Sequence, residues 1–250
     1  MRAALIVEEV GPSVEANLEG MVAAARRVGE MGAELVLFPE AALTGLINDD
    51  DPARDLPLGR PIPGPETERL GAAAREGRLY VATGLLEWDG DCLYDSAVLF
   101  DPTGDLILTY RRIQPQWHGR DADPHVYRQG NEVVAVATTH GRMAVLLCGD
   151  LFDDGIVAQA RALAPDHVLV PMSRSFSDGS FDQERWERNE EPQYVARAAL
   201  LGCTVLIVNQ LESREITRWP AFGGAWVVGP TGEVVARWPL GRRGVLWVEA

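Results

Sequence analysis

The sequence predicts a layered α/β fold, and two features of its pattern support that prediction. Apolar runs of strand length alternate with segments in which apolar residues recur at helical spacing, as expected when helices cover buried sheets. Each half of the chain also contains a hairpin turned at a Pro-Thr-Gly sequence, so the sheets must be mixed rather than purely parallel. Because no Gly/Ser-rich linker or change of composition divides the halves, we expect residues 1–250 to form a single domain.

The first half of the chain begins with a strand, a helix and a second strand. AALIV at residues 3–7 is an apolar run of strand length. The segment 13–33 has apolar residues on one helical face and Ser13 in the N-cap position. ELVLFPE at 34–40 is apolar until Pro39 and Glu40. The further elements expected are a helix near 66–77, a strand at 78–88 and a hairpin over 94–113.

The second half repeats this alternation of strands and helices. RMAVLLCGD at 142–150 is predicted to begin as a buried strand and to turn into a helix at 155–164. The elements expected after it are a strand at 167–172, a long helix near 184–201, a strand at 204–210 and a hairpin over 225–238.

Composition excludes several classes of function. The formal net charge is -14 and the isoelectric point is about 4.7, which disfavours binding to nucleic acid or to an anionic membrane surface. No apolar run approaches the roughly 20 residues that a membrane helix needs. Three cysteines, with no signal-like N-terminus, predict a cytoplasmic protein without a disulfide framework. No metal-binding cluster or phosphate-binding glycine loop is present, so no cofactor is expected.

Glu40 is a candidate general base. A carboxylate directly after an apolar strand and a proline is ordinarily a solvated strand end or a charge near a helix N-terminus. The alternative is a carboxylate that is partly desolvated at the end of the strand, with its pKa raised toward the range of a general base. The segment LVLFPEAALTG by itself leaves both interpretations open.

Cys148 is a candidate nucleophile. A lone cysteine at the end of an apolar run is ordinarily inert core, and Cys203 in LLGCTVLIV fits that description. Cys148 differs because Gly149, an acidic turn and a predicted helix follow it. A corner of this kind exposes a side chain and directs backbone N–H groups toward it, which favours a thiolate and an oxyanion beside it.

Arg111 and Arg112 end a predicted strand in a chain whose 23 basic residues are all arginine. Arginines at a strand end are ordinarily solvated, and the absence of lysine indicates a bias along the whole chain rather than a choice at one position. The polar stretch that follows is longer than a simple turn requires, and long structured loops often carry sites. Strand alternation predicts that these two side chains point in opposite directions.

The segments LFPEAALTG, YRRIQP and LLCGDLF together resemble motifs of the nitrilase superfamily of carbon-nitrogen hydrolases. YDSAVLFDPTGDLI, VLVPM, VARAALLGCTVLIVNQ and FGGAWVVGPTGEVVA follow the family's order at similar intervals, so the resemblance covers nearly the whole chain. It implies a four-layer αββα sandwich with two mixed β-sheets. It also implies a small-molecule substrate and a homodimer or higher homo-oligomer.

The resemblance assigns Glu40 as general base, Cys148 as nucleophile and Arg112 to the position of the family's catalytic lysine. The implied reaction is hydrolysis of a small amide or carbamoyl compound through a cysteine thioester. Arginine can supply the lysine's positive charge, but its wider guanidinium prefers a flat grip on carboxylates. A nitrilase-like protein that binds a small molecule without turnover is therefore the alternative.

Five further residues are candidates for substrate binding. Counting back seven residues from Gly130 places Asp123 where many members of the family have a second glutamate. Backbone N–H groups of Gly149 or Asp150 are expected to hold the oxyanion, and Trp117 and Arg174 are expected to line the pocket. The sequence departs from the family's pattern at Gln114, where histidine is usual, and at 200–201, where Glu-Asn is common.

Overall fold

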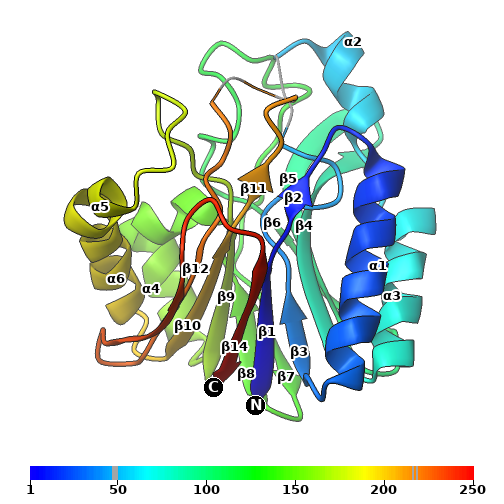
Figure 1. Ribbon diagram of the computed structural model, residues 1–250. Coiled ribbons are helices and arrows are strands. Elements are labelled where there is room, and N and C mark those ends of the chain that lie inside the picture. Colours follow the sequence, from blue (N-terminus) through cyan, green and yellow to red (C-terminus); the bar gives the residue numbers. More distant parts are fainter. Residues whose placement is uncertain (47–49, 216, 218) are drawn as a thin grey trace.

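Two six-stranded mixed sheets pack face to face between two layers of helices (Figure 1). The computed structural model describes residues 1–46, 50–215, 217 and 219–250. The first sheet has the order β14-β1-β3-β4-β5-β6. Its strands are β14 (Gly244–Glu249), β1 (Arg2–Val7), β3 (Leu35–Leu37), β4 (Tyr80–Asp89), β5 (Cys92–Phe100) and β6 (Leu106–Arg111). This architecture confirms the predicted αββα sandwich.

The second sheet has the order β13-β12-β10-β9-β8-β7. Its strands are β13 (Val234–Trp238), β12 (Ala225–Val228), β10 (Thr204–Asn209), β9 (His167–Met172), β8 (Gly141–Val145) and β7 (Ala135–Thr138). A small parallel pair, β2 (Glu9–Val10) and β11 (Leu211–Glu212), joins the two halves of the chain.

Helices α1 (Val14–Glu30) and α3 (Pro65–Gly77) cover the first sheet, and α4 (Asp154–Ala162) and α6 (Glu191–Ala199) cover the second (Figure 1). Shorter elements are α2 (Pro52–Asp55), α5 (Gln183–Arg185), the 3₁₀ turns Leu56–Leu58 and Cys148–Phe152, and a π-helical turn at Trp186–Glu190. The largest buried cluster draws on both sheets and includes Leu37 and Leu99 from the first sheet and Val145 and Leu206 from the second.

The expected first helix is confirmed in its position, cap and buried face. The Ser13 hydroxyl accepts a hydrogen bond from the backbone N–H of Ala16 at 3.3 Å. Leu18, Met21, Ala25 and Val28 are buried as predicted, whereas Val22 is only partly buried.

Two elements differ from the sequence prediction. The expected helix near 184–201 is interrupted by the π-helical turn, and α6 begins with Glu191 and Pro192, whose ring nitrogen cannot donate a helical hydrogen bond. The C-terminal strand β14 was not predicted, because its inner face contributes only Leu246 and Val248 to the buried core. β14 pairs antiparallel with β1, so the two chain ends lie together at one end of the sheets (Figure 1).

The segment that carries Glu40 lies directly on strand β4. The backbone N–H of Gly84 donates to the Pro39 carbonyl at 3.2 Å, and the Gly84 carbonyl accepts from the N–H of Leu43 at 3.4 Å. A Cβ atom at Gly84 would lie 2.6 Å from the Ala41 nitrogen and 2.8 Å from the Cα of Glu40. Glycine is therefore required here by the close approach of two backbones.

We expect Gly84→Ala to lower the free energy of unfolding by about 1–3 kcal/mol, because the added methyl group must displace the Glu40 segment. Denaturant unfolding measures this effect. Gly20→Ala on α1 is the control, since a Cβ there meets nothing within 4 Å and should raise helix stability by about 0.5–1 kcal/mol. Equal stability of the two variants would contradict the close approach.

Candidate active site

A buried ion cluster connects strand β5 of the first sheet with the segments that follow β3 and β6. Nη1 of Arg112 donates to Oε1 of Glu40 at 2.8 Å and to Oδ2 of Asp95 at 3.3 Å. Both carboxyl groups are completely buried, and Arg112 is 3 % exposed. Glu40 follows β3, Asp95 lies within β5, and Arg112 follows β6. The register of three strands therefore determines the geometry of this cluster.

The alternation of strand β6 separates Arg112 from Arg111, as predicted. Arg111 points the other way, to Glu87 at 2.5 Å and Asp89 at 2.7 Å, with its guanidinium 3.8 Å from the ring centre of Tyr94. Arg112 and Tyr110 share the inner side and are both buried. Of these two arginines, Arg112 is thus the one that faces the second sheet and Cys148.

Cys148 occupies a sharp corner between strand β8 and helix α4. Its backbone has a φ of 39°, a left-handed conformation that is unusual for a residue with a side chain. A Cβ atom on the neighbouring Gly149 would lie 2.5 Å from Nη2 of Arg112 and 3.0 Å from Oε1 of Gln114. Glycine at 149 therefore lets the corner approach the guanidinium group.

Asp150 holds this corner against the first sheet. Its Oδ2 accepts hydrogen bonds from the Tyr110 hydroxyl at 2.7 Å and from the backbone N–H of Leu147 at 3.0 Å. Its Oδ1 accepts from the backbone N–H groups of Gln114 at 2.8 Å and Ile113 at 3.2 Å. The carboxylate is completely buried.

The expectation that Asp150 contacts substrate needs correction. With four donors, its side chain has a structural role, and its backbone N–H already donates to the Leu147 carbonyl at 2.9 Å. Gly149 lies in the first turn of the 3₁₀ segment, where N–H groups have no partner within the helix. Gly149 is therefore the better candidate for an oxyanion donor.

A cavity of about 540 Å³ opens beside Cys148. Its lining comes from both sheets and from helix α6: Arg112, Gln114, Gln116, Cys148, Gly149, Phe152, Asp153, Ser173, Arg174 and Tyr194. Arg174 lines it as predicted, and its guanidinium binds Glu190 of the π-helical turn at 3.0 and 3.1 Å. The cavity thus brings the cysteine, a buried cation and several polar side chains together.

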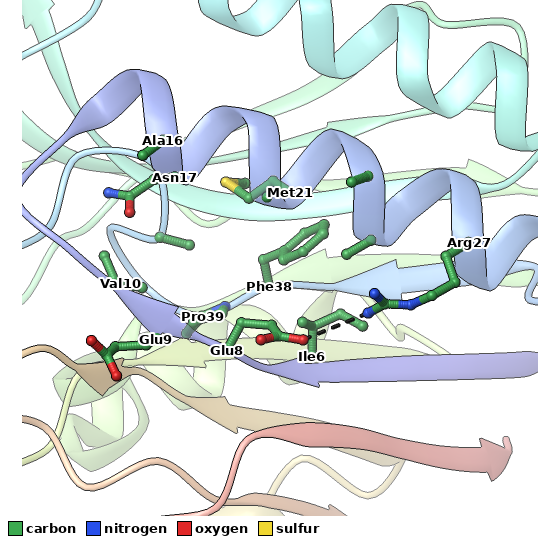
Figure 2. A pocket seen from close by; sticks show the side chains of 14 residues that line it. Ile6, Glu8, Glu9, Val10, Ala16, Asn17, Met21, Arg27, Phe38 and Pro39 are labelled. Carbon is green, nitrogen blue, oxygen red and sulfur yellow. Dashed lines mark ion pairs between the residues drawn. The ribbon is translucent and has the colours of Figure 1, made fainter.

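A second pocket, of about 240 Å³, lies between helix α1 and strand β1 (Figure 2). Met21 and Phe38 line it, and the dashed line in Figure 2 marks the 3.6 Å ion pair between Glu8 and Arg27. Among the described residues that line this pocket there is no cysteine, serine or histidine. Of these two pockets, the cavity beside Cys148 is the one lined by a cysteine next to a buried cation, so we place the candidate site there.

Two other sequence predictions are wrong about position. Asp123 is exposed, and its carboxylate accepts from the backbone N–H of His125 at 2.9 Å. The second carboxylate on Arg112 is Asp95 instead. Trp117 is buried in a small cluster with Leu86, Leu93, Ala122 and Tyr127, so it packs the loop rather than lining the cavity.

Asp95 was missed by the sequence analysis. The sequence feature that indicates it is an aspartate inside the apolar strand segment YDSAVLF. A charge buried within a strand needs a partner, so this aspartate is a candidate for a buried ion pair.

Burial dominates the electrostatics of the cluster. Desolvation and the nearby Cys148 raise the pKa of Glu40 above its usual value, although the positive charge of Arg112 opposes the shift. Desolvation and the Glu40 charge likewise raise the pKa of Asp95. The surrounding acids hold the pKa of Arg112 above its usual value in spite of burial. Burial thus makes Glu40 a stronger proton acceptor than a solvated glutamate, which suits proton exchange with Cys148.

Within the described ranges, no group of three or more histidine, cysteine, aspartate or glutamate side chains is arranged to hold a metal ion. In the same part of the chain, no helix is both long and apolar enough to span a membrane.

Comparison with known proteins matches residues 3–250 to the carbon-nitrogen hydrolase family. The aliphatic nitrilase of Sinorhizobium fredii (strain HH103) is 32% identical over 94% of this chain and 81% of that protein. A formamidase of Bacillus cereus (strain Q1) is 30% identical over 59% of this chain, and Nitrilase 3 from an unknown prokaryotic organism is 32% identical over 58%. The matched parts are 43% of that formamidase and 47% of Nitrilase 3, so the chain matches less than half of either protein.

Solved structures show the same fold. An amidase from Nesterenkonia sp. superimposes with a TM-score of 0.82 at 24% identity, over 99% of this chain and 89% of that one. A variant of the Nesterenkonia sp. AN1 amidase, with acrylamide added at its active-site cysteine, gives a TM-score of 0.83 at 23% identity, over 100% and 93% of the two chains.

We expect Cys148 to react with iodoacetamide faster than the other two cysteines at neutral pH, because it borders a cavity beside a buried cation. Burial raises the pKa of Cys203 to about 11, which lowers its thiolate fraction about 100-fold relative to an ordinary thiol. Mass spectrometry of the native protein after timed labelling identifies the order. Faster labelling of Cys92, whose sulfur lies 3.5 Å from the His125 carbonyl, would contradict the assignment.

Proposed function

Because this chain belongs to the carbon-nitrogen hydrolase family, we propose that it hydrolyses the carbon–nitrogen bond of a small amide or carbamoyl compound through a thioester on Cys148. The observation that carries the proposal is the buried pair of Glu40 and Arg112 directly behind a cavity-lining cysteine. A general base, a nucleophile and a fixed cation at one place are the groups that acyl transfer requires.

In the proposed reaction, Glu40 accepts the thiol proton of Cys148 while the sulfur attacks the carbonyl carbon. The oxyanion forms between Nη2 of Arg112 and the backbone N–H of Gly149. Glu40 then gives its proton to the departing nitrogen, and ammonia or an amine leaves. Water attacks the thioester as Glu40 takes its proton, and the carboxylic acid is released with the thiol restored.

The contacts of Arg112 support its role as the oxyanion's cation. Nη1 is held by Glu40 and Asp95, whereas Nη2 makes only a long hydrogen bond, of 3.3 Å, to Oε1 of Gln114. Nη2 is also the guanidinium atom nearest to a Cβ position on Gly149. One end of the guanidinium is therefore anchored and the other end faces the nucleophile corner.

The relatives guide the choice of substrates. Two of them are named nitrilases and one a formamidase, so nitriles and formamide belong in a screen beside simple amides and carbamoyl compounds. The cavity of about 540 Å³ suits a small molecule.

A second candidate function is binding without turnover. It is favoured because two acidic side chains, Glu40 and Asp95, already bind Arg112. They offset part of the positive charge that would stabilise an oxyanion.

We expect the protein to release ammonia from at least one member of a panel of small amides, carbamoyl compounds and nitriles. Cys148→Ala should lower this release at least about 10³-fold, because no thioester can form. Coupled detection of ammonia measures both rates. Cys92→Ala is the control and should retain turnover. Thermal stabilisation by an amide, without ammonia release above background, would favour the binding-only function.

We expect Arg112→Lys to keep turnover within about tenfold of the wild type or to raise it, because ammonium restores a compact cation in the same place. Arg112→Ala should lower turnover about 10²- to 10³-fold through loss of an oxyanion donor. It should also lower the free energy of unfolding by about 3–5 kcal/mol, since buried carboxylates lose their partner. Steady-state kinetics and denaturant unfolding measure the two effects.

Arg111→Ala is the matched control for these variants. It also removes the cation from a buried glutamate, Glu87, and should therefore lower stability without a comparable loss of turnover. An equal loss of turnover in Arg111→Ala and Arg112→Ala would show that the Arg112 effect is only structural.

A further inference from the structure

We propose that Asp95 is a positioning residue for Glu40: its carboxyl group stays protonated inside the protein and donates that proton to the Glu40 carboxylate. The role in proton transfer rests on the proposed function, whereas the presence of the bound proton does not. Asp95 lies within β5, and the proposed reaction does not otherwise use it.

The geometry of the cluster leaves one oxygen of each carboxyl group without a protein donor. Arg112 reaches Oε1 of Glu40 and Oδ2 of Asp95 through the same nitrogen. Among the described residues, no hydrogen bond reaches Oε2 of Glu40 or Oδ1 of Asp95, and both atoms are buried. A buried carboxylate oxygen without a donor is costly. A single proton shared by the two side chains lets one carboxyl group donate a hydrogen bond and the other accept it.

Charge balance leads to the same result. Two ionised carboxylates and one guanidinium would leave one uncompensated negative charge in a fully buried site. One proton makes the cluster neutral. This is the behaviour expected of two carboxyl groups that share a site, where the like charges cannot both be ionised at low cost.

The other titratable groups around the cluster supply no second positive charge. Besides Asp95 and Arg112, the main groups that act on Glu40 are the thiol of Cys148 and the carboxylate of Asp150, and the hydroxyl of Tyr194 lies close by. Each of these is neutral or negative, so none removes the need for the proton. The guanidinium of Arg174 lines the same cavity, but it is paired with Glu190. Burial and the Glu40 charge both raise the pKa of Asp95, in agreement with a neutral acid.

The contact lengths indicate which group holds the proton. The Arg112 nitrogen is 2.8 Å from Glu40 and 3.3 Å from Asp95. The closer carboxylate gains more from the positive charge and is favoured as the ionised member. Glu40 is thereby kept as a proton acceptor for the thiol, and Asp95 serves as its hydrogen-bond donor.

The bound proton has a signature in stability that needs no turnover. Free aspartate and glutamate lose their protons near pH 4, whereas burial and the Glu40 charge raise the pKa of Asp95 well above that range. Between about pH 5 and 8 the folded protein therefore binds at least one more proton than the unfolded chain, so stability falls as pH rises. Asp95→Asn, whose amide can donate without a titrating proton, should remove the part of this dependence that comes from the cluster and leave the part that comes from other buried acids such as Glu212.

We therefore expect the ratio of the wild-type unfolding constant to that of Asp95→Asn to rise about tenfold per pH unit across this window. Denaturant unfolding from pH 5 to 8 measures it. Asp123→Asn, which changes an exposed aspartate, is the control and should follow the wild type. If Asp95→Asn does not fold, Glu40→Gln replaces it in the experiment. That variant leaves Asp95 as the single carboxylate beside Arg112, and such a pair is neutral without a bound proton. Curves of the folded variant that stay parallel to the wild type would overturn the proposal.

The positioning role is tested by a second pair of variants in the active enzyme. Asp95→Leu removes the donor, raises the pKa of Glu40 and should move the acid limb of kcat/KM to higher pH by about one unit. Asp95→Asn should restore the limb, because its amide donates to Glu40. A purely structural residue would lower stability without moving the limb. Identical limbs in all three proteins would overturn the positioning role even if the stability experiment shows the bound proton.

Discussion

The buried contact between Arg112 and Glu40 is the interaction on which the rest of the site depends. Both groups are withdrawn from water, and the loss of hydration is offset only if their geometry is held closely. Strands β3, β5 and β6 provide that geometry, because Glu40 and Arg112 follow β3 and β6 and Asp95 lies within β5. A shift of β5 or β6 by one residue would turn Asp95 or Arg112 toward the other face of the sheet.

Asp150 extends this constraint from the first sheet to the second. It accepts one hydrogen bond from the hydroxyl of Tyr110, which lies on the inner face of β6. It accepts another from the backbone N–H of Leu147, the residue before Cys148. The left-handed conformation of Cys148 is thus held by a residue that is itself anchored across the sandwich. The position of the thiol relative to the guanidinium therefore follows from the hydrogen bonds that join the two sheets through Asp150.

The sequence predicted those parts of the site that local pattern determines. Glu40 follows a strand, Cys148 follows another, and period-two alternation separates Arg112 from Arg111. It did not predict the partners across the fold. Asp95 and Glu40 are 55 residues apart, so no spacing rule relates them. Asp123 was selected by counting along a loop, but the path of that loop turns its side chain to solvent.

In the proposed reaction, the guanidinium of Arg112 stabilises the oxyanion. A crystal structure with a small aliphatic aldehyde tests it most directly, since a hemithioacetal on Cys148 has the tetrahedral shape of the intermediate. We expect the adduct oxygen to lie within hydrogen-bond distance of Nη2 of Arg112 and of the Gly149 N–H. An adduct oxygen that points away from Arg112, while both its nitrogens stay on Glu40, Asp95 and Gln114, would contradict it.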